Sequence, residues 1–124
     1  MRNRGRDRGA AAVEFAFIVP LLVLLVLGIA EFGRAYYLQT TVSNAAREGA
    51  RVMALSDDQA RAREAAKTAA TTVALADSQI TFSTDSCTPE TQVTATVSYP
   101  MEFLTGMFGA NLTLEGKGVM LCNG

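Results

Sequence analysis

The chain has 124 residues and a mass of 13.2 kDa, which leaves room for one small domain and little else. About half of it (49%) is apolar but only 7% is aromatic, so alanine and aliphatic residues supply the hydrophobicity. The absence of His and Trp and the presence of only two Cys exclude His-dependent catalysis and the usual Cys/His zinc cages. Since no phosphate loop, nucleophile motif or paired carboxylates are visible either, we expect a protein that is not an enzyme and uses no cofactor or metal.

The formal net charge of −1 conceals a strong asymmetry along the chain. Four Arg and one Asp lie in residues 2–8, whereas residues 55–124 hold four basic and eight acidic side chains. A basic tract this short, without interleaved aromatic residues and followed by an acidic remainder, argues against a nucleic-acid partner. We therefore take the position of the arginines, directly before an apolar segment, as their informative feature.

An apolar run extends from Ala10 to Ala30 and contains a single ionisable side chain, that of Glu14. As a helix it spans roughly 31 Å, close to the thickness of the hydrocarbon core of a bilayer. A remainder of about 90 residues is too small to bury such a helix on all sides, so we expect a single transmembrane span. Pro20 within the run is tolerated in membrane helices.

The arginine-rich tract directly precedes this span, and basic residues that flank a span stay in the cytoplasm. We therefore expect a cytoplasmic N-terminus and an extracytoplasmic location for everything after Glu31. A secretory signal peptide is the competing interpretation, with Gly28-Ile29-Ala30 as a small-x-small cleavage site. The length of the apolar run and its internal acidic residue argue against a signal peptide.

Glu14 is the fifth residue after Gly9, and two interpretations of it are open. Its carboxylate lies about one helical turn inside the boundary of the span, so it can simply reach the cytoplasmic headgroups. Alternatively it belongs to a processing motif, because the segment RGAAAVEFAFIVP resembles the type IV prepilin processing site. The adjoining EFGRAYYLQTTVSNAAREGARVMA resembles the TadE-like family of tight-adherence (Flp) pilus assembly systems, whose members are minor pilin-like subunits, or pseudopilins. The resemblance is most specific over residues 8–54.

The resemblance implies that a prepilin peptidase, an aspartic protease of the membrane, cleaves between Gly9 and Ala10 and removes the leader, residues 1–9. A residue without a side chain suits this position because the backbone must enter a narrow protease cleft. Cleavage frees an amine on Ala10, and in pilins the residue equivalent to Glu14 is thought to pair with the N-terminal amine of a neighbouring subunit. Mature pilins often begin with Phe or Met, so an N-terminal Ala10 is a departure that leaves N-methylation open.

The partners implied by the resemblance are the prepilin peptidase, other pilin-like or TadE-like subunits, the pilus assembly machinery and the lipid bilayer. The implied location is the bacterial cytoplasmic (inner) membrane, with incorporation into a surface pilus as a further stage. A second function stays open, namely an uncleaved single-pass membrane anchor that carries an extracytoplasmic binding module. Leader cleavage separates the two, because a plain anchor does not need it.

Helical periodicity continues beyond the span. Apolar or small residues recur on one helical face at Leu38, Val42, Ala45, Gly49 and Val52. We therefore expect one helix from about Ala10 to about Leu55, with residues 10–30 in lipid and residues 31–55 as an extracytoplasmic stalk. Small residues on this face admit a closely packed backbone, either of a partner subunit or of a second helix of the same chain, and we favour the second helix.

Residues 56–124 are expected to form a small α+β head. Ser56 as the N-cap, followed by two acids in the first turn and Gln59, is typical of a helix start, and an alanine-rich stripe continues to about Ala76. Three β-like runs follow at residues 79–83, 92–99 and about 111–121, the second of them bounded by Pro89 and Pro100. We predict an antiparallel three-stranded meander packed against both helices, which gives a pilin-like α+β fold.

Cys87 lies just before the second β-like run and Cys122 ends the third. Because antiparallel pairing places the start of one strand beside the end of its neighbour, we predict a disulfide between them, with two unpaired thiols as the alternative. The connection at residues 101–108 is unusually apolar for a loop. Contact with the bilayer or a neighbouring subunit, and a cap on the core of the head, both remain open for it.

Overall fold

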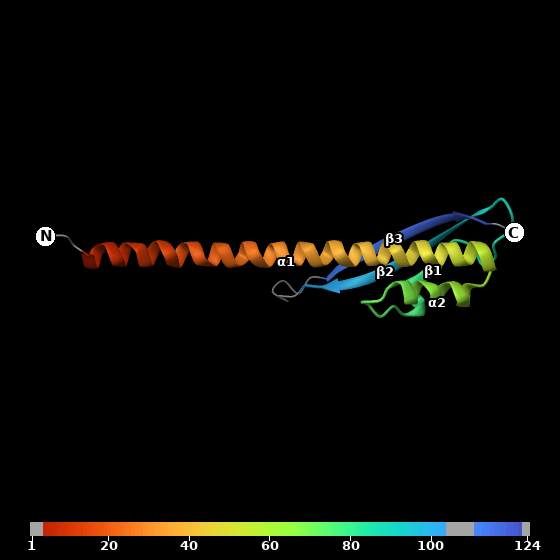
Figure 1. Cartoon of the computed structure of the whole chain (residues 1–124), viewed down its shortest axis with the longest axis horizontal. Helices are drawn as coiled ribbons and strands as arrows, with labels where there is room; N and C mark the ends of the chain where they lie inside the picture. The colour runs from red at the N-terminus through yellow and green to blue at the C-terminus, as the bar shows by residue number, and fades with distance from the viewer. Residues whose placement is uncertain (1–3, 104–110, 123–124) are drawn as a thin grey trace. The chain divides into compact units, whose positions relative to one another are not determined.

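The computed structural model describes residues 4–103 and 111–122 (Figure 1). In chain order its elements are α1 (Arg4–Ser56), α2 (Gln59–Ala69), a 3₁₀ turn η1 (Asp77–Gln79), β1 (Ile80–Phe82), β2 (Gln92–Glu102) and β3 (Asn111–Leu121). This architecture confirms the predicted α+β class. The chain divides into two compact units, Met1–Gly33 and Arg34–Gly124, and we describe each by itself.

The first unit consists of the N-terminal part of α1. The helix begins at Arg4, six residues before the predicted start at Ala10, so residues 4–9 of the tract expected to be a leader are helical. Arg and Ala are good helix formers, and Asp7 in the first turn interacts favourably with the helix dipole. Pro20 lies inside the helix without ending it.

The second unit is built on a three-stranded antiparallel sheet in the order β1-β2-β3, as the sequence predicts. The long pair β2 and β3 runs in register from Gln92 opposite Leu121 to Glu102 opposite Asn111. β2 extends three residues beyond its predicted end and passes through Pro100. The short strand β1 pairs with β2 only as far as Val97, so the missing N–H of Pro100 falls where β2 has a free edge.

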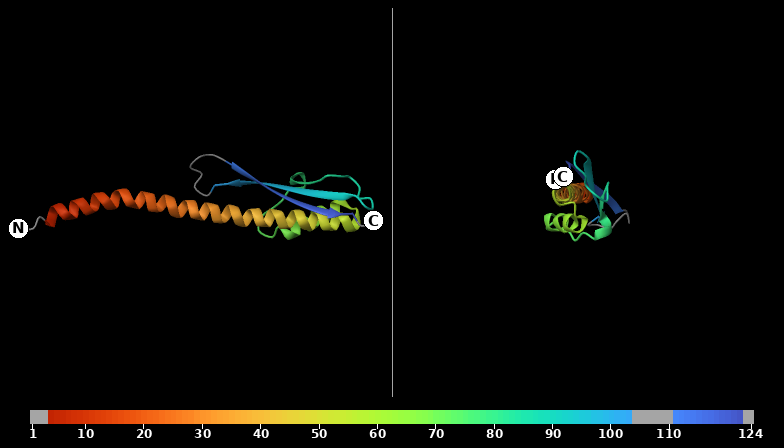
Figure 2. Two further views of the ribbon diagram at one scale, coloured as in Figure 1. Left: turned by 90° about the horizontal axis from the view of Figure 1, so that it is seen from above. Right: turned by 90° about the vertical axis from the view of Figure 1, so that its right-hand side faces the viewer.

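The core of the second unit lies between the sheet and the two helices (Figure 2). On one face of β2, Val93, Ala95, Val97 and Met101 are fully buried and Tyr99 is half-buried. The residues between them are half-buried or exposed, as expected for a sheet that is covered on one face. α1 supplies a buried face of mostly small side chains. The fully buried core side chains include Val42, Ala45, Ala46, Ala50, Met53, Ala62, Ala66, Ile80, Val93, Ala95, Val97 and Met101.

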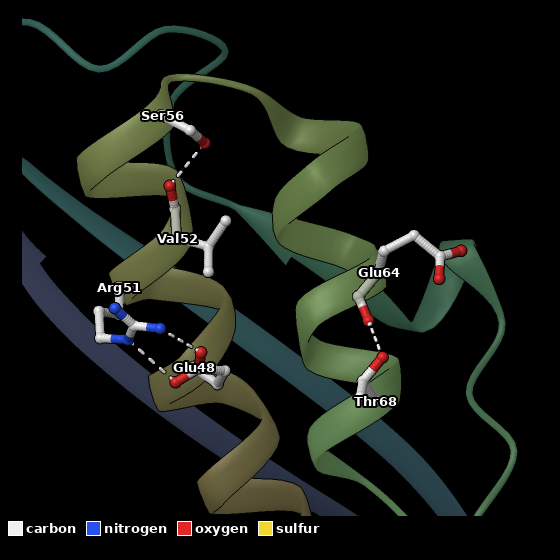
Figure 3. A network of polar contacts seen from close by, with 6 residues as sticks. All are labelled: Glu48, Arg51, Val52, Ser56, Glu64 and Thr68. Atoms are coloured by element: carbon white, nitrogen blue, oxygen red, sulfur yellow. Dashed lines mark hydrogen bonds and ion pairs between the residues drawn. The ribbon is translucent and has the colours of Figure 1, made fainter.

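The second helix begins later than predicted. Ser56 is not its N-cap, because it ends α1, where its hydroxyl donates to the carbonyl of Val52 at 2.6 Å (Figure 3). Asp57 then breaks the helix with a left-handed backbone (φ 52°). Asp58 is the actual N-cap, and its Oδ1 accepts a hydrogen bond from the N–H of Arg61 at 3.2 Å.

The second helix also ends earlier than predicted, at Ala69 instead of about Ala76. The backbone N–H of Ala70 still donates to the carbonyl of Ala66, but the chain then turns. The next three residues, 71–73, are β-branched and weak helix formers. Leaving the helix there lets Leu75 bury itself in the core between helices and sheet.

Candidate processing site, anchor and packing surfaces

The predicted processing site lies on the surface of α1 in the first unit. Gly9, Ala10 and Glu14 are all helical and exposed, and a Cβ atom added at Gly9 would have no neighbouring atom within 4 Å. Ala10 and Glu14 are four residues apart, so they share one face of the helix. The structure therefore places the carboxylate one turn away from the atom that cleavage would turn into a free amine.

The predicted span, residues 10–30, is a continuous helical surface of bare apolar side chains. By length and composition, α1 is long and apolar enough to cross a membrane, and none of its most apolar window is buried. Within the span, large hydrophobic side chains are exposed at Val13, Phe15, Phe17, Ile18, Leu21, Leu22, Val23, Leu24, Leu25, Val26 and Ile29. A surface of this size calls for lipid or other helices around it, which supports a membrane anchor.

The predicted packing face of the stalk is occupied within the chain itself. Leu38, Val42, Ala45 and Gly49 are buried and Val52 is half-buried. A Cβ atom added at Gly49 would lie 3.4 Å from Cβ of Ala66 on α2 and 3.8 Å from Cβ of Ala95 on β2. The small residues of this face therefore admit α2 and the sheet, as favoured from the sequence.

Two further packing residues were missed from the sequence. Gly116 and Gly118 lie on the inner face of β3, directly against the backbone of α1. A Cβ atom added at Gly116 would lie 2.7 Å from the carbonyl of Val42, and one at Gly118 would lie 2.6 Å from Cα of Arg47. Glycines two residues apart in a strand share one face, so this spacing could have indicated a close backbone approach.

The two cysteines form the predicted disulfide, which joins the connection before β2 to the residue that follows β3. Cys87 and Cys122 are bonded, with their Cα atoms 5.6 Å apart, and both are buried. The N–H of Cys87 also donates to Oδ1 of Asp57 at 2.5 Å, and the N–H of Cys122 donates to the carbonyl of Thr91 at 2.7 Å. The disulfide thus lies where the turn between α1 and α2 meets the end of the sheet.

Ion pairs of the second unit lie on its surface. Arg51 holds Glu48 through two hydrogen bonds, of 2.6 and 3.1 Å, and these lower the pKa of Glu48 and raise the pKa of Arg51 (Figure 3). Lys67 on α2 reaches Asp77 of η1 at 2.5 Å, a hydrogen bond that lowers the pKa of Asp77 and raises that of Lys67. Exposed pairs of this kind contribute little to stability, and we assign them to the surface of the head.

Comparison with known families connects these features. Residues 9–51 match the family model of TadE-like proteins. The match covers about a third of the chain and confirms the resemblance to TadE-like proteins inferred from the sequence of this segment. The TadE-like segment begins at the predicted scissile glycine and covers the apolar helix and most of the stalk. Comparison with curated proteins and with solved structures gave no significant match.

The described ranges, 4–103 and 111–122, contain no group of three or more Cys, Asp or Glu side chains placed to hold a metal ion. The acidic pair Asp57 and Asp58, adjacent in the sequence, is divided between two structural tasks. Asp57 accepts the hydrogen bond from Cys87, and Asp58 caps α2.

Proposed function

We propose that the chain is a pilin-like minor subunit, or pseudopilin, which a prepilin peptidase processes after Gly9 and which takes part in the assembly of a tight-adherence pilus. The observation that carries this proposal is the extent of the TadE-like segment, residues 9–51. It contains Gly9, Glu14, the apolar helix and most of the buried stalk face in one matched segment. The head, residues 56–124, lies outside it.

Processing requires α1 to open locally, because Gly9 and Ala10 are helical. Gly9 lies near the start of the helix at Arg4, where terminal turns fray. A glycine in a helix also costs roughly 1 kcal/mol relative to alanine, which favours opening at this point. The exposed surroundings of Gly9 leave space for an enzyme to approach the bond.

After cleavage, the new amine on Ala10 lies one turn from Glu14 on the surface of the helix that we propose to span the bilayer. An isolated carboxylate there is costly, and it gains most by pairing with an opposite charge. Cleavage supplies such a charge at the end of every processed subunit. We propose that Glu14 meets the amine of a neighbouring subunit, so that processing creates one half of an assembly contact.

The fold of the second unit supports a structural role for the remainder of the chain. α1 from Arg34 onward is the central packing element of the second unit, since the sheet and α2 both bury residues against it. The disulfide fixes the far end of the sheet.

The experiment is co-expression of the full chain with a prepilin peptidase, with cleavage followed by gel mobility and intact mass. We expect wild type to lose nine residues and Gly9→Leu to keep them. Gly5→Leu is the matched control, because Gly5 is an equally exposed helical glycine of the same tract. Retention of the leader by wild type, or equal cleavage of both variants, would contradict the proposal and favour the uncleaved anchored module.

A further inference from the structure

At one end of the second unit, the end of β2 and the start of β3 lie beside the first residues of α1 that belong to this unit. Nη1 of Arg34 donates to the carbonyl of Glu102 at 2.6 Å, and Glu102 is the last residue of β2. Leu38, one turn further along α1, forms a buried cluster with Met101 and Leu114. This end of the sheet therefore lies at the residues of α1 that follow the apolar run directly.

The same end exposes large side chains with apolar bodies. Tyr36 is 70% exposed and Tyr37 is 54% exposed on α1, and Leu112 near the start of β3 is 42% exposed. Leu112 is placed here by its pairing with Met101. Farther along the same helix the exposed residues are polar at Thr40, Asn44, Arg47 and Arg51, until Leu55 (60% exposed) in its last turn.

We propose that this end of the second unit, formed by Tyr36, Tyr37 and Leu112, docks into the interfacial layer of the lipid bilayer. The inference rests on the membrane anchor of the proposed function and adds a contact of the folded head. Tyrosine suits this layer because its ring is apolar while its hydroxyl remains hydrated. The cationic Arg34 lies beside the same end, where it suits the phosphate groups of lipids.

Continuity with the apolar run selects lipid as the occupant. Tyr36 follows the end of that run by six residues, which is roughly 9 Å of helical rise. Residues that follow a membrane span this closely belong to the headgroup layer, which adds several ångströms to each side of the hydrocarbon core. Leu112 brings a second, distant part of the chain to this end of the second unit, through its pairing with Met101.

The test uses the absence of tryptophan from the chain. Single tryptophans are introduced at exposed positions as Tyr36→Trp and Leu112→Trp, and the full chain is placed in nanodiscs at one copy per disc. The lipids carry bromine near the top of their acyl chains, which quenches tryptophan at the interface. Val119→Trp is the matched control, because Val119 is 55% exposed on the same strand as Leu112 but pairs with Thr94 toward its other end.

We expect Tyr36→Trp and Leu112→Trp to lose most of their fluorescence in brominated discs and Val119→Trp to keep its own. Leu24→Trp, in the middle of the apolar run, tests the membrane anchor separately. Its fluorescence should be quenched in a second set of discs, whose lipids carry bromine deep in their acyl chains. Quenching of Leu24→Trp without quenching at positions 36 and 112 would overturn the docking inference and leave the anchor intact. Loss of quenching at position 24 would instead contradict the proposed membrane anchor. Shielding of positions 36 and 112 only when two copies share a disc would identify a second copy as the occupant and also overturn the inference.

Discussion

The contact of β3 with α1 allows a sharp test of how the head is held to its helix. Gly116 and Gly118 of β3 lie so close to the backbone of α1 that no side chain fits between the strand and the helix. We expect Gly118→Ala to destabilise the head, although alanine is normally favoured over glycine in a strand. Gly49→Ala should instead stabilise the protein, although Gly49 is itself a buried residue of α1.

The magnitude follows from the distances. A Cβ atom at Gly118 would lie 2.6 Å from Cα of Arg47 and 2.7 Å from the carbonyl oxygen of Ala46, well inside the 3.4 Å at which ordinary contact begins. Both obstacles are helix backbone, so no rotamer change relieves them, and β3 and α1 must separate by most of an ångström. Overpacking of this kind costs about 1–3 kcal/mol, offset in part by the roughly 0.5–1 kcal/mol that alanine gains over glycine.

The two strand glycines should not be additive. Gly116 faces Val42 and Ser43, about one turn from the contact of Gly118, so a single displacement of α1 relieves both clashes. We expect a net loss of about 1–2 kcal/mol for each single alanine and less than the sum for the double variant. At Gly49 the nearest atom would be 3.4 Å away, so the helix propensity of alanine, worth up to about 1 kcal/mol, decides the sign.

The assay is urea unfolding of the full chain in detergent micelles, followed by pulse proteolysis, which reports the folded fraction of the head. Lys117→Ala serves as a second control, because Lys117 is exposed and lies between the two glycines on the same strand. Wild-type stability for Gly118→Ala, or equal losses for Gly118→Ala and Gly49→Ala, would refute the inferred backbone contact.

Three further predictions concern the head. Replacing Cys87 and Cys122 together by Ser removes a bridge with a sequence separation of 35; by the chain-entropy model we expect a loss of about 3–4 kcal/mol in the same unfolding assay. Asp57→Ala should cost about 1–3 kcal/mol because it leaves the N–H of Cys87 without its acceptor, whereas Asp57→Asn keeps an acceptor and tolerates the left-handed backbone, so it should be much milder. The Lys67–Asp77 pair lowers the pKa of Asp77; its stabilisation is therefore present above the ordinary Asp pKa of about 4 and is lost as the pH falls below it. The difference in unfolding midpoint between wild type and Asp77→Asn should accordingly be small at neutral pH and vanish in acid, and a difference that grows in acid would contradict this assignment.

The elements whose apolar residues recur with a clear period could be predicted from the sequence. The alternation of Val93, Ala95 and Val97 with threonines gave the central strand and its buried face, since only one face of the sheet is covered. The disulfide followed from antiparallel pairing alone. The stalk face was recognised because small and apolar residues recur at helical spacing.

Element ends were less predictable, because they depend on tertiary contacts. Ser56 is a good N-cap in isolation, but its hydroxyl bonds back to Val52 and extends α1. Asp57 takes the left-handed position because its carboxylate meets Cys87, thirty residues later in the chain. Nothing local to either residue reports that contact. The glycine pair of β3 had a usable signal in its spacing, but the helix that it contacts lies far away in sequence.

The central claim is that the chain becomes an assembly subunit when its leader is removed after Gly9. The measurement that tests it most directly is N-terminal sequencing of the protein recovered from membranes and from sheared filaments of cells that express it with its pilus system. The account predicts a sequence that begins AAAVEF, with Ala10 first. Recovery of a chain that still begins with Met1 from cells that make normal filaments would contradict it.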